Sequence, residues 1–288
     1  MTVDPRHAGA ADLYRLLCDV VNPRPIALVS TLSAEGRANA APYSFFNAVS
    51  ASPPVLVVGA AAREGGGAKD TLANLRATGE CVVNVVPHAL VRRAVLASLP
   101  WPADASEFDA AGFTALASDV VAAFRIKESP VHLECKLRDV RDLGGPAGSA
   151  LVLLDVWRVH LADDLLDARG RVEPQRLDLV GRLGARNYVR AAGEAVFAVR
   201  PPGRPLPIGY AALPHDLLAS PVLTGDDLAR LAGAATLPSP AEVAEARTRD
   251  TRIREAADER ALHGYVRELI AAGHVEYALA VAMGVERP

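Results

Sequence analysis

The sequence of 288 residues predicts a mainly β fold, an antiparallel barrel with a few inserted helices, followed by a helical C-terminal segment. Short apolar or alternating runs recur through the first two thirds of the chain, whereas only two segments there have the pattern of helices. That ratio excludes a regular alternation of strand and helix. Closing the strands into a barrel would also remove exposed sheet edges.

Five runs are expected to form strands: residues 26–32, 55–59, 81–86, 131–140 and 150–160. Residues 33–36 form a turn after the first run, so residues 37–43 should return as its hairpin partner. The two helices are expected at residues 71–78, before Gly79, and at residues 88–99, before Pro100. Together these elements account for the barrel and its inserted helices.

The run at residues 131–138 alternates strictly, which places its side chains on two faces. One face carries Val131, Leu133, Cys135 and Leu137, and the other carries His132, Glu134, Lys136 and Arg138. We expect the first face in the core and the second in water or at an interface. His132 and Glu134 would lie two residues apart on one face, but two ligands make an incomplete metal site, so no metal is predicted.

A Pro-rich and Gly-rich stretch at residues 201–205 predicts a boundary between a barrel domain, residues 1–200, and a helical extension, residues 201–288. Thr224 should cap a helix through Leu231, and Ser239 with Glu242 has the pattern of a capping box. The last helix should carry an apolar stripe, and the tail is expected to pack on the barrel or on a second subunit. The members of the stripe are Leu262, Val266, Leu269 and Ile270.

The overall composition limits the function classes. Half of the residues are hydrophobic, 23% are charged and the net charge is −3, which argues against a nucleic-acid-binding surface. No apolar run reaches the ~20 residues of a membrane helix, and the N-terminus lacks a signal-peptide pattern. The cysteines, Cys18, Cys81 and Cys135, are odd in number and far apart, so no disulfide framework is indicated. We expect a soluble, cytoplasmic protein without nucleic-acid or membrane partners.

The most distinctive segment is residues 24–47, reading RPIALVSTLSAEGRANAAPYSFFN. Two strand-like runs lead into a polar and aromatic loop that offers hydroxyl groups from Thr31 and Ser44, backbone amides, and the apolar area of Phe45 and Phe46. Because adjacent residues on a strand face opposite sides, at least one of the two phenylalanines should lie in the core. The segment has the chemistry of a ligand site.

A second candidate segment runs from Gly65 to Thr71 and leads into a helix, where free amides and the helix dipole favour an anion. Lys69 adds a positive charge, so the segment has the features of a phosphate clamp. Taken alone, the glycines are equally typical of a hairpin tip, and Asp70 or Thr71 is equally typical of a helix cap.

Several catalytic patterns are missing from the sequence. It contains no HExxH, no GxxxxGK[ST] and no GxGxxG motif, and no Ser-His-Asp order. Neither a hydrolytic centre nor a separate dinucleotide-binding domain is therefore expected, and no catalytic side chain is assigned.

The order of the motifs resembles the flavin reductase-like, FMN-binding split-barrel family, which includes flavoredoxin and the reductase components of two-component monooxygenases. The resemblance spans roughly residues 20–200 and rests on R-P-I-A-x-V-S-T, N-x-A-P-Y-S-F-F-N, K-D-T-x-x-N and G-R-L-G-x-x-x-Y, in that order. Residues 208–240 also resemble an extension found on longer members.

The resemblance implies a homodimeric split barrel that binds FMN near the subunit interface. Matching positions at the ring and ribityl chain are Thr31, Asn39, Ala41, Pro42, Tyr43, Ser44, Phe45 and Phe46, and those near the phosphate are Lys69, Asp70 and Thr71. Arg182 and Tyr188 would lie in a strand-poor loop that closes over the flavin. Alternatively, Arg182 would lie on the barrel rim and Tyr188 in the core. Arg24 would contact the phosphate or pyrimidine, or form a salt bridge with Glu35.

The activity implied is that of an NAD(P)H:flavin reductase, in which hydride passes from NADH or NADPH to FMN. FMN would be either tightly bound or exchanged, and a monooxygenase or electron-transfer protein is the implied partner. Two alternatives stay open: a flavoredoxin-like electron carrier, and a non-catalytic flavin-binding or interaction protein.

Overall fold

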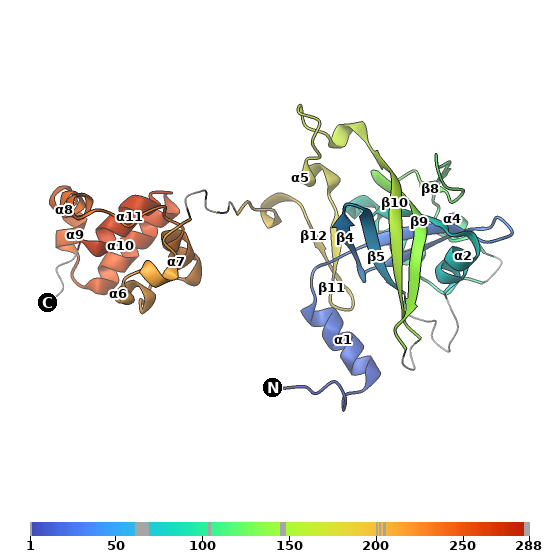
Figure 1. Ribbon diagram of the computed structural model, residues 1–288, viewed down its shortest axis with the longest axis horizontal. Coiled ribbons are helices and arrows are strands. Elements are labelled where there is room, and N and C mark those ends of the chain that lie inside the picture. The colour runs from blue at the N-terminus through green and yellow to red at the C-terminus, as the bar shows by residue number, and fades with distance from the viewer. Residues whose placement is uncertain are drawn as a thin grey trace. The chain divides into compact units, whose positions relative to one another are not determined.

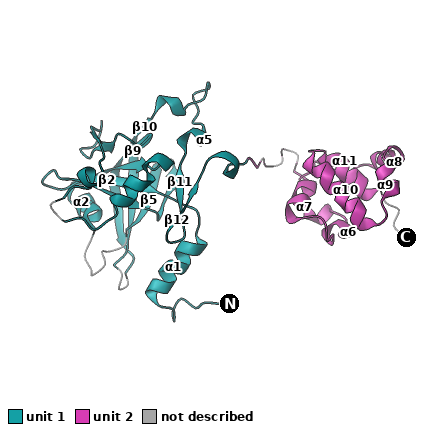
Figure 2. Ribbon diagram, turned by 180° about the vertical axis from the view of Figure 1, so that it is seen from behind, with its two compact units in different colours: residues 1–197 teal, residues 198–288 magenta. Residues whose placement is uncertain are grey.

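The computed structural model of the protein describes residues 2–60, 69–102, 105–144, 148–199, 201, 203 and 206–284. The chain separates into two compact units, Met1–Phe197 and Ala198–Pro288 (Figure 2). The first unit carries the β-sheets, and the described part of the second unit is helical (Figure 1).

The main sheet of the first unit has seven antiparallel strands in the order β3-β2-β6-β9-β10-β5-β4. Its strands are β2 (Ala27–Leu32), β3 (Ala38–Tyr43), β4 (Phe46–Ala51), β5 (Pro54–Ala60), β6 (Glu80–Val85), β9 (Val131–Asp142) and β10 (Ala150–Leu161). These strands confirm the predicted strand runs and the predicted hairpin of residues 26–43.

The sheet closes because its two edge strands are consecutive in the chain. Only Ser44 and Phe45 connect β3 to β4, and so short a connection spans about 10 Å between Cα atoms. The two edges therefore meet at this connection, and the sheet curls into a barrel. Gly59 on β5 permits the closure: its N–H donates to the Phe45 carbonyl at 2.7 Å, and a Cβ at this position would lie 2.9 Å from the Phe45 Cβ.

Apolar side chains are buried on both sides of strand β2, which explains its continuous apolar run. Ala27 and Val29 belong to the barrel interior, whereas Leu28 packs on the opposite side with residues of the inserted helices, such as Ala94 and Phe108. The barrel interior and the helix-covered face are thus two separate cores that share one strand.

The predicted helix at residues 71–78 is α2 (Asp70–Thr78), which ends at Gly79 with a φ of 74°, a left-handed conformation that glycine adopts readily. The predicted helix at residues 88–99 is shorter than expected, consisting of η1 (His88–Leu90) and α3 (Val91–Leu96). Further elements of this unit are α1 (Ala10–Val20), α4 (Glu107–Ala110), β7 (Ala115–Leu116), β8 (Arg125–Ile126), η2 (Asp163–Leu165), α5 (Pro174–Leu177) and η3 (Gly193–Ala195).

A second, three-stranded sheet has the order β1-β11-β12, formed by β1 (Arg24–Pro25), β11 (Val180–Leu183) and β12 (Asn187–Arg190). The prediction that Arg182 and Tyr188 lie in a strand-poor loop is therefore wrong, because they are Cα partners on a hairpin. The sequence does not indicate these strands, because strands of two and four residues are too short to show an alternation. In addition, β11 pairs with Arg24 and Pro25, which lie far away in the sequence.

The polar face of β9 is also more buried than expected. His132 is 7% exposed and Glu134 is fully buried, so the prediction of a wet or interfacial face is wrong for this half of the strand. On the opposite face, Cys81 and Cys135 are Cα partners across β6 and β9, and both are buried free thiols.

The helical unit consists of η4 (Tyr210–Ala212), α6 (His215–Leu218), α7 (Gly225–Ala232), α8 (Pro240–Arg249), α9 (Thr251–Glu255), α10 (Glu259–Ala271) and α11 (Val275–Met283). Both predicted caps are confirmed: Thr224 with Asp227, and Ser239 with Glu242, form complete capping boxes. Among the described residues, no helix combines the length and the apolar character needed to cross a membrane.

The apolar stripe of α10 is buried within the helical unit. Leu262, Val266 and Ile270 are at most 3% exposed and pack in one core with side chains of α7 and α11. The stripe is therefore buried within its own unit, and packing of the helical unit on the barrel or on a second subunit stays a prediction. The sequence pattern showed that the stripe is buried but not what buries it.

Candidate functional site

Two adjoining cavities lie on one side of the barrel. The first, of about 260 Å³, lies between α1, the end of β3, α3 and the β11–β12 hairpin. The second, of about 510 Å³, lies between β3, the start of α2 and the segment after α3. Pro42 and Ser98 line both cavities, so the two cavities adjoin and are treated together as one candidate site.

Most of the residues that the sequence singles out lie around these cavities. The first cavity is lined by Arg24, Pro42, Tyr43, Ser44, Arg182 and Tyr188, and the second by Asn39, Ala41, Pro42, Lys69, Asp70 and Thr71. Thr31, Phe45 and Phe46 line neither. The glycines at residues 65–67 lie outside the described residues.

Arg24 holds the walls of the first cavity together. One guanidinium nitrogen donates to the carbonyl oxygens of Cys18 at 2.5 Å and Val21 at 3.0 Å, and the other donates to Gly184 at 3.1 Å. The first two oxygens lie at the C-terminal end of α1, where a positive charge is favourable. The alternative of a salt bridge to Glu35 is wrong, since Arg24 donates to these carbonyl groups and makes no ion pair with Glu35, both of which are described residues.

Arg182 and Tyr188 form one contact pair on the first cavity. The Arg182 guanidinium donates to the Tyr188 hydroxyl and to the Ala185 carbonyl, and its carbon atom lies 4.7 Å from the centre of the tyrosine ring. With Arg24, this places two guanidinium groups around the first cavity. Such groups suit a planar polar edge or an anion.

A buried hydrogen-bond network joins α2 to the barrel beside the second cavity. Asn39 accepts from the hydroxyls of Thr31 at 3.3 Å and Thr71 at 3.1 Å, and Asn74 donates to Thr31 at 3.0 Å. Thr71 is therefore not the cap of α2; the capping position is Lys69, which makes no side-chain cap bond. Thr31 is 1% exposed, so it positions Asn39 rather than facing the cavity.

Glu107 is a site residue that the sequence did not reveal. Its carboxylate accepts from the Asn39 side-chain amide at 3.0 Å and from the Ala40 N–H at 3.4 Å. Burial raises the pKa of Glu107, and the charge of Asp70 adds to the rise. Lys69 lies nearby, with its ammonium nitrogen 5.4 Å from the centre of the Tyr43 ring. The second cavity thus combines one lysine with two carboxyl groups.

The two phenylalanines point in different directions, as the alternation predicts. Phe46 packs against the barrel core, so its expected place at the ligand is not supported. Phe45 is 40% exposed and meets the Tyr14 ring edge to face, with ring centres 6.0 Å apart.

Tyr14 and Cys18 of α1 also line the first cavity, and sequence reasoning missed both. The signal available was their spacing of four residues, which places them on one face of a helix. Ser98 and Trp101, also missed, reach the second cavity from the segment after α3.

A third cavity, of about 620 Å³, shares Val91, Val95 and Tyr188 with the first. Its rim carries Arg190, which forms an ion pair with Asp178 at 2.6 Å. This cavity gives room for a second molecule beside anything bound in the first.

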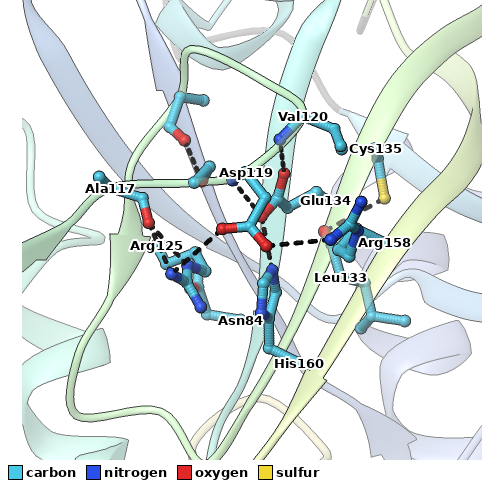
Figure 3. Close-up of polar contacts among 12 residues, drawn as sticks. Asn84, Ala117, Asp119, Val120, Arg125, Leu133, Glu134, Cys135, Arg158 and His160 are labelled. Atoms are coloured by element: carbon cyan, nitrogen blue, oxygen red, sulfur yellow. Dashed lines mark hydrogen bonds and ion pairs between the residues drawn. The ribbon is translucent and has the colours of Figure 1, made fainter.

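Glu134, considered from the sequence as half of a metal site, belongs to a different cluster (Figure 3). Its carboxylate accepts from the N–H groups of Asp119 at 2.8 Å and Val120 at 2.6 Å, and lies 2.6 Å from the His160 Nε2. His132 does not join it; its Nε2 lies 2.9 Å from the Ile126 carbonyl. The cluster fastens the loop before β8 to β9 and β10.

Arginines complete this cluster, since Arg158 lies 3.1 Å and Arg125 lies 3.9 Å from the Asp119 carboxylate. Asp119, Glu134 and His160 offer possible ligand atoms within 4.8 Å of one another. Each of them, however, already has a hydrogen-bond or ion-pair partner in the cluster. We therefore interpret the cluster as structural.

Replacing Glu134 by glutamine should destabilise the barrel by about 2–4 kcal/mol, because a buried charged acceptor of several hydrogen bonds is lost. Burial opposes the charge of Glu134, but the N–H groups of Asp119 and Val120 and the contact with His160 outweigh it and lower its pKa from 4.5. The stabilisation is therefore complete above this ordinary pKa and is lost as the pH falls through the lowered one.

Tryptophan fluorescence during urea unfolding measures this effect, since both tryptophans, Trp101 and Trp157, lie in the barrel unit. The exposed Glu194→Gln is the matched control and should leave the barrel unchanged. Equal stability of the Glu134 variant and the wild type at pH 7 would show that the cluster does not stabilise the fold.

Comparison with known proteins identifies the family of the barrel unit. The model of the flavin reductase like domain matches residues 21–175, more than half of the chain, and the helical unit lies outside this match. Among the solved structures similar to the chain are three for which the comparison covers 69% of it.

Nitrilotriacetate monooxygenase component B from Bacillus cereus is 32% identical, with a TM-score of 0.64 and 98% of that chain covered. The 2-nitrobenzoate 2-nitroreductase NbaA of Pseudomonas fluorescens is 31% identical, with a TM-score of 0.62 and 96% covered. A putative flavin reductase with a split barrel domain from Shewanella frigidimarina is 22% identical, with a TM-score of 0.59 and 100% covered. The last similarity confirms the split-barrel fold.

Proposed function

Since the chain belongs to the flavin reductase-like domain family, we propose that it binds FMN across the two adjoining cavities and acts as an NAD(P)H:flavin oxidoreductase. The observation that carries this proposal is that the two cavities adjoin, with Pro42 and Ser98 lining both. A ring in the first cavity and a phosphate in the second would be joined by the ribityl chain past these two residues. Cofactor sites of this kind have volumes of roughly 300–1,000 Å³.

The lining residues offer contacts suited to FMN at both ends, although the second cavity also contains the carboxyl groups of Asp70 and Glu107. In the first cavity, Ile26 and Val91 offer apolar contact and Arg182 a polar one. The Arg24 Nε is buried without a hydrogen-bond partner among the described residues, and an acceptor on the ligand would satisfy it. In the second cavity, Lys69 lies at the N-terminal end of α2, where an anion is favoured.

FMN would supply the ring that accepts a hydride from NADH or NADPH. The residues of the chain position the reacting molecules and exclude water. We assign the third cavity to the nicotinamide or another second substrate. Val91, Val95 and Tyr188 line both this cavity and the first, so molecules bound in the two cavities would lie side by side.

Lys69→Ala should weaken FMN binding by about tenfold or more, because a charge-assisted hydrogen bond to the phosphate contributes roughly 1.5–3 kcal/mol. The fold should be unaffected, since such a change outside the core usually shifts stability by less than about 0.5 kcal/mol. Quenching of flavin fluorescence during titration measures the affinity, and the exposed Lys127→Ala is the matched control. Unchanged affinity in Lys69→Ala would place the phosphate in the first cavity, near Arg24 and Arg182.

We also propose that the protein is a homodimer. On β10, Trp157, Val159 and Leu161 are 60%, 50% and 42% exposed and alternate along the strand, which gives the barrel an uncovered apolar strip. A second copy of the barrel would cover it. Light scattering of the purified protein measures the mass in solution, and a monomer would contradict the proposal.

The similarity to a monooxygenase component supports an oxygenase as the partner that receives reduced flavin. The similarity to a nitroreductase favours a second candidate function, the reduction of a nitroaromatic compound in the third cavity. Oxidation of NADH or NADPH, followed with free FMN or with a nitroaromatic acceptor, separates the two functions. Slow oxidation with either acceptor would favour an electron carrier.

A further inference from the structure

The helical unit contains a group of three possible metal ligands. Asp216 on α6, and Glu259 and His263 on α10, offer ligand atoms that all lie within 4.8 Å of one another (Figure 1 shows the two helices). Glu259 and His263 are four residues apart on one helix, so they share a face. The neighbouring Leu217 is fully buried and anchors α6.

His263 is the residue that distinguishes this group from an ordinary acidic surface. It is 1% exposed, and its Nδ1 lies 2.8 Å from the Ser220 Oγ. Its Nε2 has no hydrogen-bond partner among the described residues. A buried polar atom without a partner is rare and unfavourable. An imidazole held from behind at one nitrogen, with the other nitrogen open toward carboxylates, is typical of a metal ligand.

The Nε2 faces the Glu259 carboxylate at 3.9 Å, which is too long for a hydrogen bond. Ligand atoms at about 2.0–2.2 Å from one cation lie up to about 4 Å apart, so the present separations need only small side-chain adjustments. Glu259 can make them, because its side chain is 63% exposed.

The cluster around Glu134 shows that the residue types alone do not indicate a metal site. It also contains two carboxylates and a histidine, but the Glu134 oxygens accept backbone N–H groups and the His160 Nε2 is paired with them. At His263, by contrast, Nε2 makes no hydrogen bond among the described residues, and the Glu259 carboxylate lies 3.9 Å from it.

We propose that Asp216, Glu259 and His263 bind a divalent transition-metal cation, with Zn²⁺ as the best match. Imidazole with carboxylates suits Zn²⁺ and its neighbours, whereas Mg²⁺ and Ca²⁺ prefer oxygen ligands alone. Three protein ligands leave a position for water. The cation would join α6 to α10 and stabilise the helical unit.

Calorimetric titration of the chelator-treated full-length protein with Zn²⁺ tests the proposal. We expect one Zn²⁺ per chain at this site, a raised melting temperature, and no comparable binding of Mg²⁺. Glu259→Gln should weaken binding by at least the roughly 10- to 100-fold that loss of an outer-shell partner causes. Because His263→Ala also empties a core position, the exposed Glu259 gives the deciding variant.

Glu255→Gln, which changes another exposed glutamate of the same unit, is the matched control and should bind Zn²⁺ as the wild type does. Absence of Zn²⁺ binding by the wild type would overturn the proposal. Equal affinity of Glu259→Gln and the wild type would also overturn it, and would leave His263 and Glu259 as an ion pair only.

Discussion

Replacing Ser98 by tryptophan is expected to abolish FMN binding while the barrel stays folded. Ser98 lines both cavities at their junction, and its hydroxyl donates to the Val95 carbonyl at 2.6 Å. The side chain is exposed, so an indole there fills the site rather than the core. A ligand that must displace it should bind at least about 100-fold more weakly, equivalent to about 2.7 kcal/mol.

Flavin fluorescence titration measures the loss, and circular dichroism shows whether the fold is retained. Ser98→Ala removes the hydroxyl without adding volume and should bind FMN nearly as the wild type does. If Ser98→Trp kept wild-type affinity, FMN would have to bind outside the two cavities.

Arg24→Ala is expected to destabilise the barrel unit by about 3 kcal/mol and to weaken FMN binding at least tenfold. The guanidinium joins the C-terminal carbonyls of α1 to Gly184 in the β11–β12 turn, and both segments form walls of the first cavity. Arg24 is 5% exposed, and hydrogen bonds from a charged group contribute about 1.5–3 kcal/mol each. Without it, the two walls would lose their common anchor.

Urea unfolding followed by tryptophan fluorescence, together with FMN titration, measures both effects. Arg24→Lys keeps the charge but has only one nitrogen, which does not bridge α1 and the β11–β12 turn as the guanidinium does. It should therefore recover only part of the stability and affinity. An Arg24→Ala protein within 0.5 kcal/mol of the wild type, roughly the range of a surface substitution, would contradict the role of Arg24 as anchor.

The sequence predicted the barrel well where a strand is long enough to show its period. The strands around residues 26–43 and 131–160 have clear apolar runs, and the caps at Thr224 and Ser239 depend only on residues a few positions away. The hairpin of β11 and β12 was missed because its identity depends on pairing between Arg24 and Arg182, which are separated by most of the unit. Local patterns do not contain this information.

The residues of the candidate site likewise divide into those that a local sequence motif indicates and those that depend on distant segments. Pro42, Lys69 and Arg182, which line the cavities, could be singled out from the sequence because they belong to contiguous motifs. Glu107 was not, because its role arises only when α4 brings it to Asn39. Likewise, the alternation of β9 predicts a polar surface position for Glu134, but the loop that contains Asp119 covers it. Burial of a charge depends on segments that its own neighbourhood in the sequence does not show.

The most direct test of the central claim is the absorption spectrum of the full-length protein with FMN, recorded without oxygen before and after adding NADH or NADPH. We expect a yellow protein whose near-ultraviolet and blue bands bleach with at least one nicotinamide. A protein that stays colourless and does not retain added FMN would contradict the proposed cofactor. A yellow protein that neither nicotinamide bleaches would contradict the proposed reaction.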